Sequence, residues 1–345
     1  MDGDRDRTIE RVRQILESAG FYVTDAHHVR PTSFDLLARR DALLLILKVL
    51  KNIDALDPSE AERLRGLGQL FPASPLVIGQ TSGATELEPG VVYNRYGVQI
   101  VVEESLRDFL LKGLPPFLFS SPGGIFARID GRRLRELRVE RDLSLGALAA
   151  VAGVSRRTIQ LYEEGAGAEV DIVERLEGFL GEPIALALDL FLQRATDAPR
   201  RNRPGSRPDS DEEETGSPAP KSPGRGAELP RTGDAMRDTV FRQLDGMGWE
   251  VVVTVRCPFD AFTHGATRHA EEILLTSVGS VRTAQHRAEL LLQLARVAEG
   301  HALFVVRDAP PRKTVEGLPL VSMDELRRHR DRAELIELLS EREGL

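Results

Sequence analysis

The sequence predicts a multidomain protein in which two related α/β domains flank a small all-α domain. Three observations lead to this prediction. Two segments repeat one pattern of helices and strands, a middle stretch contains short amphipathic helices without a convincing strand, and one segment is rich in Pro, Gly, Ser and charge. A chain of 345 residues, 41% of them hydrophobic, also favours two or three compact units with buried cores.

Composition suggests where the domains begin and end. Residues 194–235 are nearly empty of large apolar side chains, so we expect a disordered linker there. A milder break falls at 113–124, GLPPFLFSSPGG, where prolines and glycines interrupt the chain. We therefore predict an α/β domain at 1–120, an all-α domain at 128–192, the linker at 194–235, and a second, diverged α/β domain at 236–345.

The repeat begins where a helix passes into a strand. ILESAGFYV at 15–23 resembles QLDGMGWEV at 243–251, and Gly20 matches Gly248 at an offset of 228 positions. The next segments follow in the same order: SFDLLARRDALLLILKVL resembles PFDAFTHGATRHAEEILLTSV, SPLVIG resembles HALFVV, and GVQIVVEESLRDFL resembles GLPLVSMDELRRHR. Each copy indicates a sheet flanked by helices, and two copies at this long period indicate a duplication.

The middle segment carries the pattern of two short helices joined by an Ala-Gly-Val turn. Ser144 stands at the N-cap position before LGALAAVA, and Ser155 can cap the helix RRTIQLYEE. Gly153 lies between them, where positive φ costs a glycine little. The pattern therefore predicts a helix-turn-helix.

The second of these helices has two faces. Ile159 and Tyr162 are three positions apart and are expected to face the core. This turns Arg156, Arg157, Gln160 and Leu161 outward. For an isolated Arg-Arg pair a solvated helix surface would be the simpler interpretation, but the intact motif around the pair favours DNA binding.

The segment SLGALAAVAGVSRRTIQLYEEG resembles the Cro and lambda-repressor type of helix-turn-helix. The resemblance implies an internal salt bridge between Arg138 and Glu163, with Gly153 and Ile159 as further structural residues. Leu145 departs from the family, which usually has a phosphate-contacting Gln there. We predict this set of DNA-binding residues: Ser144, Ser155, Arg156, Arg157, Thr158, Gln160 and Leu161.

Charge is distributed unevenly along the chain. The formal net charge is −8, which argues against a protein that coats polyanions. Residues 128–162 nevertheless contain eight arginines against four acids, whereas residues 163–182 contain seven acids and one arginine. The positive charge therefore gathers on the helices expected to face DNA.

The first α/β copy resembles the restriction-endonuclease and Holliday-junction-resolvase fold. That family places an Asp on one strand and a Glu-x-Lys pair on the next to hold a divalent metal. Asp35 and Lys48 stand at the Asp and Lys positions, but Ile46 replaces the acid. The metal would lose a carboxylate ligand, so we predict an inactive, vestigial site.

The second copy diverges further from that pattern. Asp260 stands at the Asp position, while Leu274 and Thr276 occupy the acid and Lys positions. Glu271 and Glu272 lie just upstream in the same expected strand, which leaves a shifted site open. We expect Asp260 to be a structural residue.

The whole order of domains resembles a family of archaeal HTH-type transcriptional regulators. The resemblance implies a sequence-specific regulator that binds double-stranded DNA, and we expect a homodimer because one recognition helix covers one half-site. The apolar segment VERLEGFLGEPIALALDLFL (173–192) or the sheets of the outer domains could supply the dimer contact.

Two other functions remain open. One is a metal-dependent nuclease or DNA-junction-processing enzyme, and the other is an interaction scaffold that no longer binds DNA, which the departure at Leu145 keeps open. We assign no catalytic, metal-binding or cofactor-binding residue. The single cysteine, Cys257, is expected to be a buried thiol inside the strand-like VVVTVRCPFDAF. No membrane span or secretion signal is readable, so we expect a cytoplasmic protein.

Overall fold

The computed structural model describes residues 3–25, 33–191, 231–266 and 271–343. The chain divides into two compact units that alternate along the sequence. One comprises Met1–Gly20, Leu47–Arg65 and Ser74–Arg200, and the other comprises Phe21–Ile46, Gly66–Ala73 and Arg201–Leu345. Residues 1–120 contribute to both units, so the domain boundaries derived from the sequence stay a prediction.

The first α/β copy alternates helices and strands in the expected order. Its elements are α1 (Gly3–Ser18), β1 (Tyr22–Asp25), β2 (Leu36–Arg40), β3 (Leu43–Asn52), the 3-10 helix η1 (Ile53–Ala55), α2 (Pro58–Leu70), β4 (Ser74–Ser82), β5 (Thr85–Glu86), β6 (Val91–Arg95), β7 (Val98–Val101) and α3 (Glu103–Lys112). β3 and β4 contain continuous runs of buried residues. Such runs are typical of strands that are covered on both faces.

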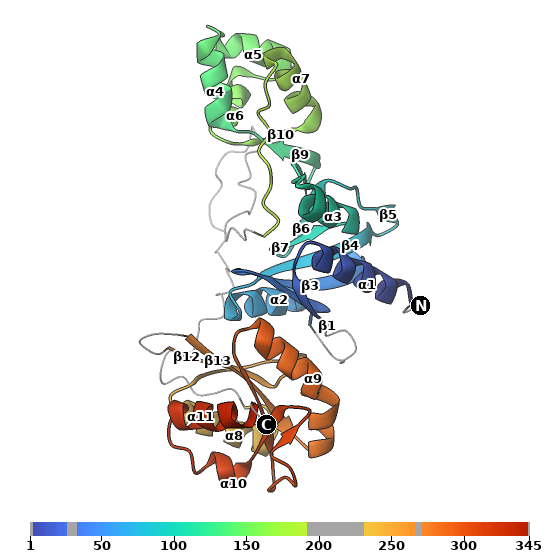
Figure 1. Cartoon of the computed structure of the whole chain (residues 1–345). Helices are drawn as coiled ribbons and strands as arrows, with labels where there is room; N and C mark the ends of the chain where they lie inside the picture. The colour runs from blue at the N-terminus through green and yellow to red at the C-terminus, as the bar shows by residue number, and fades with distance from the viewer. Residues whose placement is uncertain (1–2, 26–32, 192–230, 267–270, 344–345) are drawn as a thin grey trace. The chain divides into compact units, whose positions relative to one another are not determined.

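The middle segment forms a bundle of short helices, drawn in green in Figure 1. Its elements are β8 (Leu118–Ser121), β9 (Gly124–Arg128), α4 (Gly131–Glu140), α5 (Leu145–Ala152), α6 (Arg156–Glu163), β10 (Gly167–Glu169) and α7 (Val170–Leu180). Leu134, Leu148, Ile159 and Leu176 are each 0% exposed and belong to one core. The helices therefore share a hydrophobic centre of their own.

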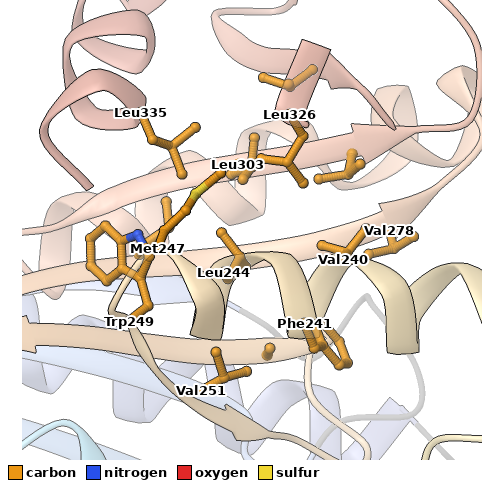
Figure 2. Close-up of a cluster of buried hydrophobic side chains, with 14 of the residues drawn as sticks. Val240, Phe241, Leu244, Met247, Trp249, Val251, Val278, Leu303, Leu326 and Leu335 are labelled. Carbon is orange, nitrogen blue, oxygen red and sulfur yellow. The ribbon is translucent and has the colours of Figure 1, made fainter. Parts of the chain in front are cut away.

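The second α/β copy repeats the first with fewer strands. Its elements are α8 (Ala235–Gly246), β11 (Glu250–Val253), β12 (Ala261–Ala266), β13 (Glu271–Gly279), α9 (Val281–Val297), β14 (His301–Val306), β15 (Thr314–Val315), β16 (Leu318–Ser322), α10 (Met323–Leu326) and α11 (Arg332–Glu343). Its core gathers Phe241, Leu244, Met247 and Trp249 from α8 and the turn after it (Figure 2).

The two sheets have the same strand order over their shared part. The larger sheet runs β1-β2-β3-β4-β7-β6-β8-β9-β10, with β5 beside β4, and the smaller runs β11-β12-β13-β14-β16-β15. In both, the first two strands are antiparallel, and β4–β7 corresponds to the parallel pair β14–β16. The predicted fold class, two related α/β folds around a helical bundle, is confirmed.

The register of the strands supports a duplication. Val77 pairs with Ile100 in the first copy, and the sequence-equivalent Phe304 pairs with Leu320 in the second. Each copy also closes a hairpin with two consecutive positive-φ residues, Tyr96-Gly97 in one and Glu316-Gly317 in the other. Turns of this kind match the right-handed twist of paired strands. Pairing and turn geometry are thus repeated together.

The middle segment contains strand structure that the sequence does not predict. β10 pairs with β9 in antiparallel register, and an isolated bridge joins Ile129 to Ala185. β10 spans only three residues, of which Ala168 alone is buried. A strand this short leaves no alternation to detect, which explains the wrong expectation that residues 128–192 lack strands.

The expectation for Cys257 is also wrong. Its side chain is half-buried and lies between β11 and β12, so VVVTVRCPFDAF is not one strand. Arg256 adopts a φ of 56°, and Pro258 has no N–H to donate to a ladder. Both features interrupt the strand.

Two further expectations concern residues 173–235. Within the apolar segment 173–192, Ile184 and Leu190 are each 1% exposed, whereas Phe179 and Leu186 are exposed, so the role of this segment in a dimer contact stays a prediction. The predicted linker, 194–235, lies outside the described residues apart from its last five, and α8 begins at Ala235. In the described part of the chain, no helix is both long and apolar enough to span a membrane.

Candidate nucleic-acid interface

Local capping fixes the boundaries of α5 and α6. Ser144 Oγ accepts a hydrogen bond from Ala147 N at 3.0 Å, and Ser155 Oγ accepts one from Thr158 N at 3.1 Å. Between the helices Gly153 has a φ of 71°, a conformation that glycine adopts without strain. These contacts turn the chain sharply between two eight-residue helices.

α6 buries one face and exposes the other. Ile159 is 0% and Tyr162 6% exposed, and burial raises the pKa of the Tyr162 hydroxyl. Arg156, Arg157 and Gln160 are exposed. Two arginines and one glutamine are therefore exposed on the first turns of α6, while the opposite face of the helix is buried.

Three of the predicted DNA-binding residues have more local roles. Leu161 is half-buried, so only part of its side chain is accessible. The Ser155 and Thr158 hydroxyls lie 2.9 Å apart and bond to each other at the helix start. Leu145, at the position where a Gln was expected, packs against the core of the bundle.

An ion pair joins α4 to the end of α6. Arg138 Nε donates to Glu163 Oε1 at 2.5 Å and Nη2 donates to Oε2 at 3.1 Å, which forms a bidentate contact. The hydrogen bond to Glu163 raises the pKa of Arg138. This salt bridge, which the sequence resemblance implies, braces the helix that carries the arginines.

The positive charge of the bundle is only partly compensated. Arg132 Nε lies 2.9 Å from Glu136 Oε1, and Arg133 Nη2 lies 3.5 Å from Glu182 Oε2. Within the described ranges, no ion pair involves Arg135, Arg141, Arg156 or Arg157. Their charge is therefore available to an external anion.

The nuclease-type positions of the first copy do not assemble a metal site. Ile46 is buried and apolar. Lys48 Nζ lies 2.7 Å from Glu60 Oε1, with the Lys48 side chain 7% exposed. Sequence reasoning missed Glu60, because an acidic residue in the first turn of a helix is common for electrostatic reasons alone. Glu60, a carboxylate paired with Lys48, comes from α2 rather than from the same strand.

Asp35 occupies the predicted Asp position immediately before β2 and is 2% exposed. A divalent cation needs several oxygen ligands. No group of three His, Cys, Asp or Glu residues suited to a metal ion occurs in the described parts of the chain. The residues present therefore do not fit the metal that the fold would imply.

In the second copy, the aspartate at the nuclease-type position, Asp260, makes contacts within the fold. Asp260 Oδ2 accepts from Val278 N at 2.8 Å, and Oδ1 lies 3.2 Å from Arg237 Nη2. Leu274 and Thr276 are both 0% exposed. Glu272 is half-buried, while the side chain of Glu271 lies outside the described residues. These contacts account for Asp260 without a metal.

The fold and this interface define a helix-turn-helix protein built together with a nuclease-type α/β fold. Comparison with known families agrees. Residues 5–116 match the model of a PD-(D/E)XK superfamily domain, and residues 134–186 match a helix-turn-helix model. No solved structure gives a significant match.

Similar proteins extend over nearly the whole chain. One from Halorubrum lacusprofundi is 33% identical over 98% of this chain and 97% of its own length, and one from Haloarcula marismortui is 35% identical with the same coverage. A third, from Methanocella arvoryzae, is 34% identical and also spans 98% and 97%. All three are named as HTH-type transcriptional regulatory proteins. The chain belongs to this family of archaeal HTH-type transcriptional regulators and is a DNA-binding regulator.

Proposed function

We propose that the protein binds DNA sequence-specifically, with α6 as a Cro-type recognition helix in the major groove. The observation that supports this most is the exposure of Arg156, Arg157 and Gln160 on the first turns of α6. The N-terminal part of a recognition helix contacts the base edges. Arginine pairs with guanine and glutamine with adenine, and the accessible part of Leu161 can touch a thymine methyl group.

We further propose that two copies act together on one site. A single α6 is eight residues long and covers one half-site. In a homodimer, two such helices would contact half-sites one DNA turn apart. Phe179 and Leu186 are exposed apolar side chains of the segment 173–192 and could supply the dimer contact, as could the sheets of the α/β folds.

The recognition helix is tested by replacing Arg157 with alanine. We expect Arg157→Ala to weaken binding to a selected duplex by about 1 to 3 kcal/mol, because a bidentate contact to a base is lost. Titration by fluorescence anisotropy measures the change. Arg328, an exposed arginine after α10, provides the matched control, because Arg328→Ala removes the same charge outside the bundle. Equal affinity for wild type and Arg157→Ala would refute the assignment.

We propose that the PD-(D/E)XK fold of this protein serves as a scaffold and does not cleave DNA. Ile46 supplies no ligand, and Lys48 is paired with Glu60. We expect duplex, single-stranded and branched DNA to stay intact when incubated with the protein and Mg²⁺ or Mn²⁺. Cleavage that Asp35→Asn abolishes would contradict this proposal and establish a nuclease.

A further inference from the structure

Gly146 is the second residue of α5, where glycine is a poor helix former compared with alanine. Its lack of a side chain has a structural consequence. A Cβ atom at this position would lie 3.0 Å from Nε, 3.3 Å from Nη2 and 3.4 Å from Cζ of Arg156. The guanidinium of Arg156 therefore lies across the first turn of α5, in the space that a side chain at position 146 would take.

The approach to Gly146 is the contact that the structure describes for the Arg156 guanidinium. Neither α5 nor α6 has an acidic residue in its first turn, and no described ion pair holds this guanidinium. Arg157 behaves differently, because its Nη1 donates to Gln160 Oε1 at 3.4 Å along α6 itself. The two neighbouring arginines thus point to different parts of the surface.

We infer that Gly146 is a positioning residue that directs Arg156 to a DNA phosphate, while Arg157 is left to contact bases. This inference rests on the proposed function of α6. A guanidinium folded onto the preceding helix cannot also extend along α6 toward a base edge. Across the first turn of α5, the guanidinium of this exposed residue has no described ion pair, which suits a contact with the sugar-phosphate backbone.

The experiment compares Gly146→Ala, Arg156→Ala and the double variant in the full-length chain. The probes are a duplex that wild-type protein retains from a random-sequence library and a scrambled duplex of equal composition. Affinity for both is measured by anisotropy at several salt concentrations, and thermal unfolding is followed in parallel. Gly178 in α7 provides the matched control, because a Cβ there would meet nothing within 4 Å.

We expect Gly146→Ala to weaken binding to both duplexes by a similar factor, roughly fivefold, while the protein remains as thermally stable as Gly178→Ala. The slope of log affinity against log salt should fall by about 1 in Arg156→Ala and by part of that in Gly146→Ala. Adding Gly146→Ala to Arg156→Ala should cause no further loss, because the glycine acts through the arginine.

Three results would overturn the inference. Wild-type affinity of Gly146→Ala beside a weakened Arg156→Ala would show that Gly146 does not position the arginine. Loss of discrimination between the two duplexes in Arg156→Ala would make Arg156 a base-contacting residue. If neither Arg156→Ala nor Arg157→Ala changed binding, the proposed function of α6 would fail as well, and this outcome is distinct from the first two.

Discussion

At the scale of single residues, two ion pairs have clear physical consequences. Arg138 and Glu163 form a bidentate contact whose side chains are only 18% and 11% exposed. In the second α/β copy, His301 Nδ1 lies 3.1 Å from Glu343 Oε2. Each pair joins two elements that are distant in the sequence, so each should influence stability more than an exposed pair would.

Neutralising Glu163 should destabilise the helix-turn-helix. In Glu163→Gln the charge of Arg138 loses its counterion in a largely desolvated position, which we expect to cost about 1 to 3 kcal/mol. Amide hydrogen exchange of α4 and α6 measures the local effect, and exchange should accelerate there. Unchanged protection of these helices would show that the pair contributes little.

The pair of His301 and Glu343 predicts a pH dependence of stability. The hydrogen bond to Glu343 and its charge raise the pKa of His301 above 6.5. A raised pKa stabilises the fold fully below the unfolded value, and this contribution is lost as pH rises through the folded pKa. We therefore expect the free energy of unfolding to fall as pH rises from about 6.5.

Trp249, the single tryptophan, is buried in the same α/β copy and reports its unfolding by fluorescence. His301→Gln should remove this part of the pH dependence. Parallel pH profiles for wild type and His301→Gln would contradict the assignment.

At the scale of elements, the helix-turn-helix depends on one close approach of backbones. A Cβ on Gly131, the first residue of α4, would lie 2.4 Å from Glu163 O and 2.5 Å from Tyr162 O at the end of α6. Only glycine allows this distance. The close packing of the start of α4 against the end of α6 therefore depends on the absence of a side chain at position 131.

Gly131→Ala should force α4 away from α6. We expect a loss of stability of roughly 2 to 4 kcal/mol, because backbone atoms cannot yield as a flexible side chain can. Thermal denaturation followed by circular dichroism measures the change. Gly178→Ala is again the control and should leave stability unchanged or raise it by up to about 1 kcal/mol. Equal melting temperatures for the two variants would contradict the argument.

Short-range patterns in the sequence predict the caps and the turn of the helix-turn-helix, but they do not predict contacts between elements that are distant in the sequence. Ser144, Gly153 and Ser155 have cap and turn chemistry that depends on adjacent residues, so their geometry could be predicted. The contact of Lys48 with Glu60 depends on how α2 packs, which no local pattern encodes. The sequence shows Gly146 as a glycine inside an alanine-rich helix. Its contact with Arg156 depends on how α5 and α6 pack, which the sequence pattern does not predict.

At the scale of the whole molecule, one α/β architecture occurs twice with the same strand order and register. Both copies keep an Asp at the first ligand position of a nuclease, Asp35 and Asp260, but Ile46 and Leu274, which are buried and apolar, stand at the position of the second acid. The carboxylate of the Glu-x-Lys pair is therefore replaced at its usual position in both copies. The exposed, uncompensated arginines of the chain's helix-turn-helix instead favour recognition of DNA.

The most direct test of this account is selection of DNA from a random-sequence duplex library, followed by sequencing at two salt concentrations. Wild-type protein should enrich paired half-sites centred about 10 base pairs apart, and the enrichment should survive the higher salt. A variant with both Arg156→Ala and Arg157→Ala should lose it. If wild type retains DNA without a shared sequence, or if the double variant enriches the same sites, α6 is not the recognition helix and the central claim is wrong.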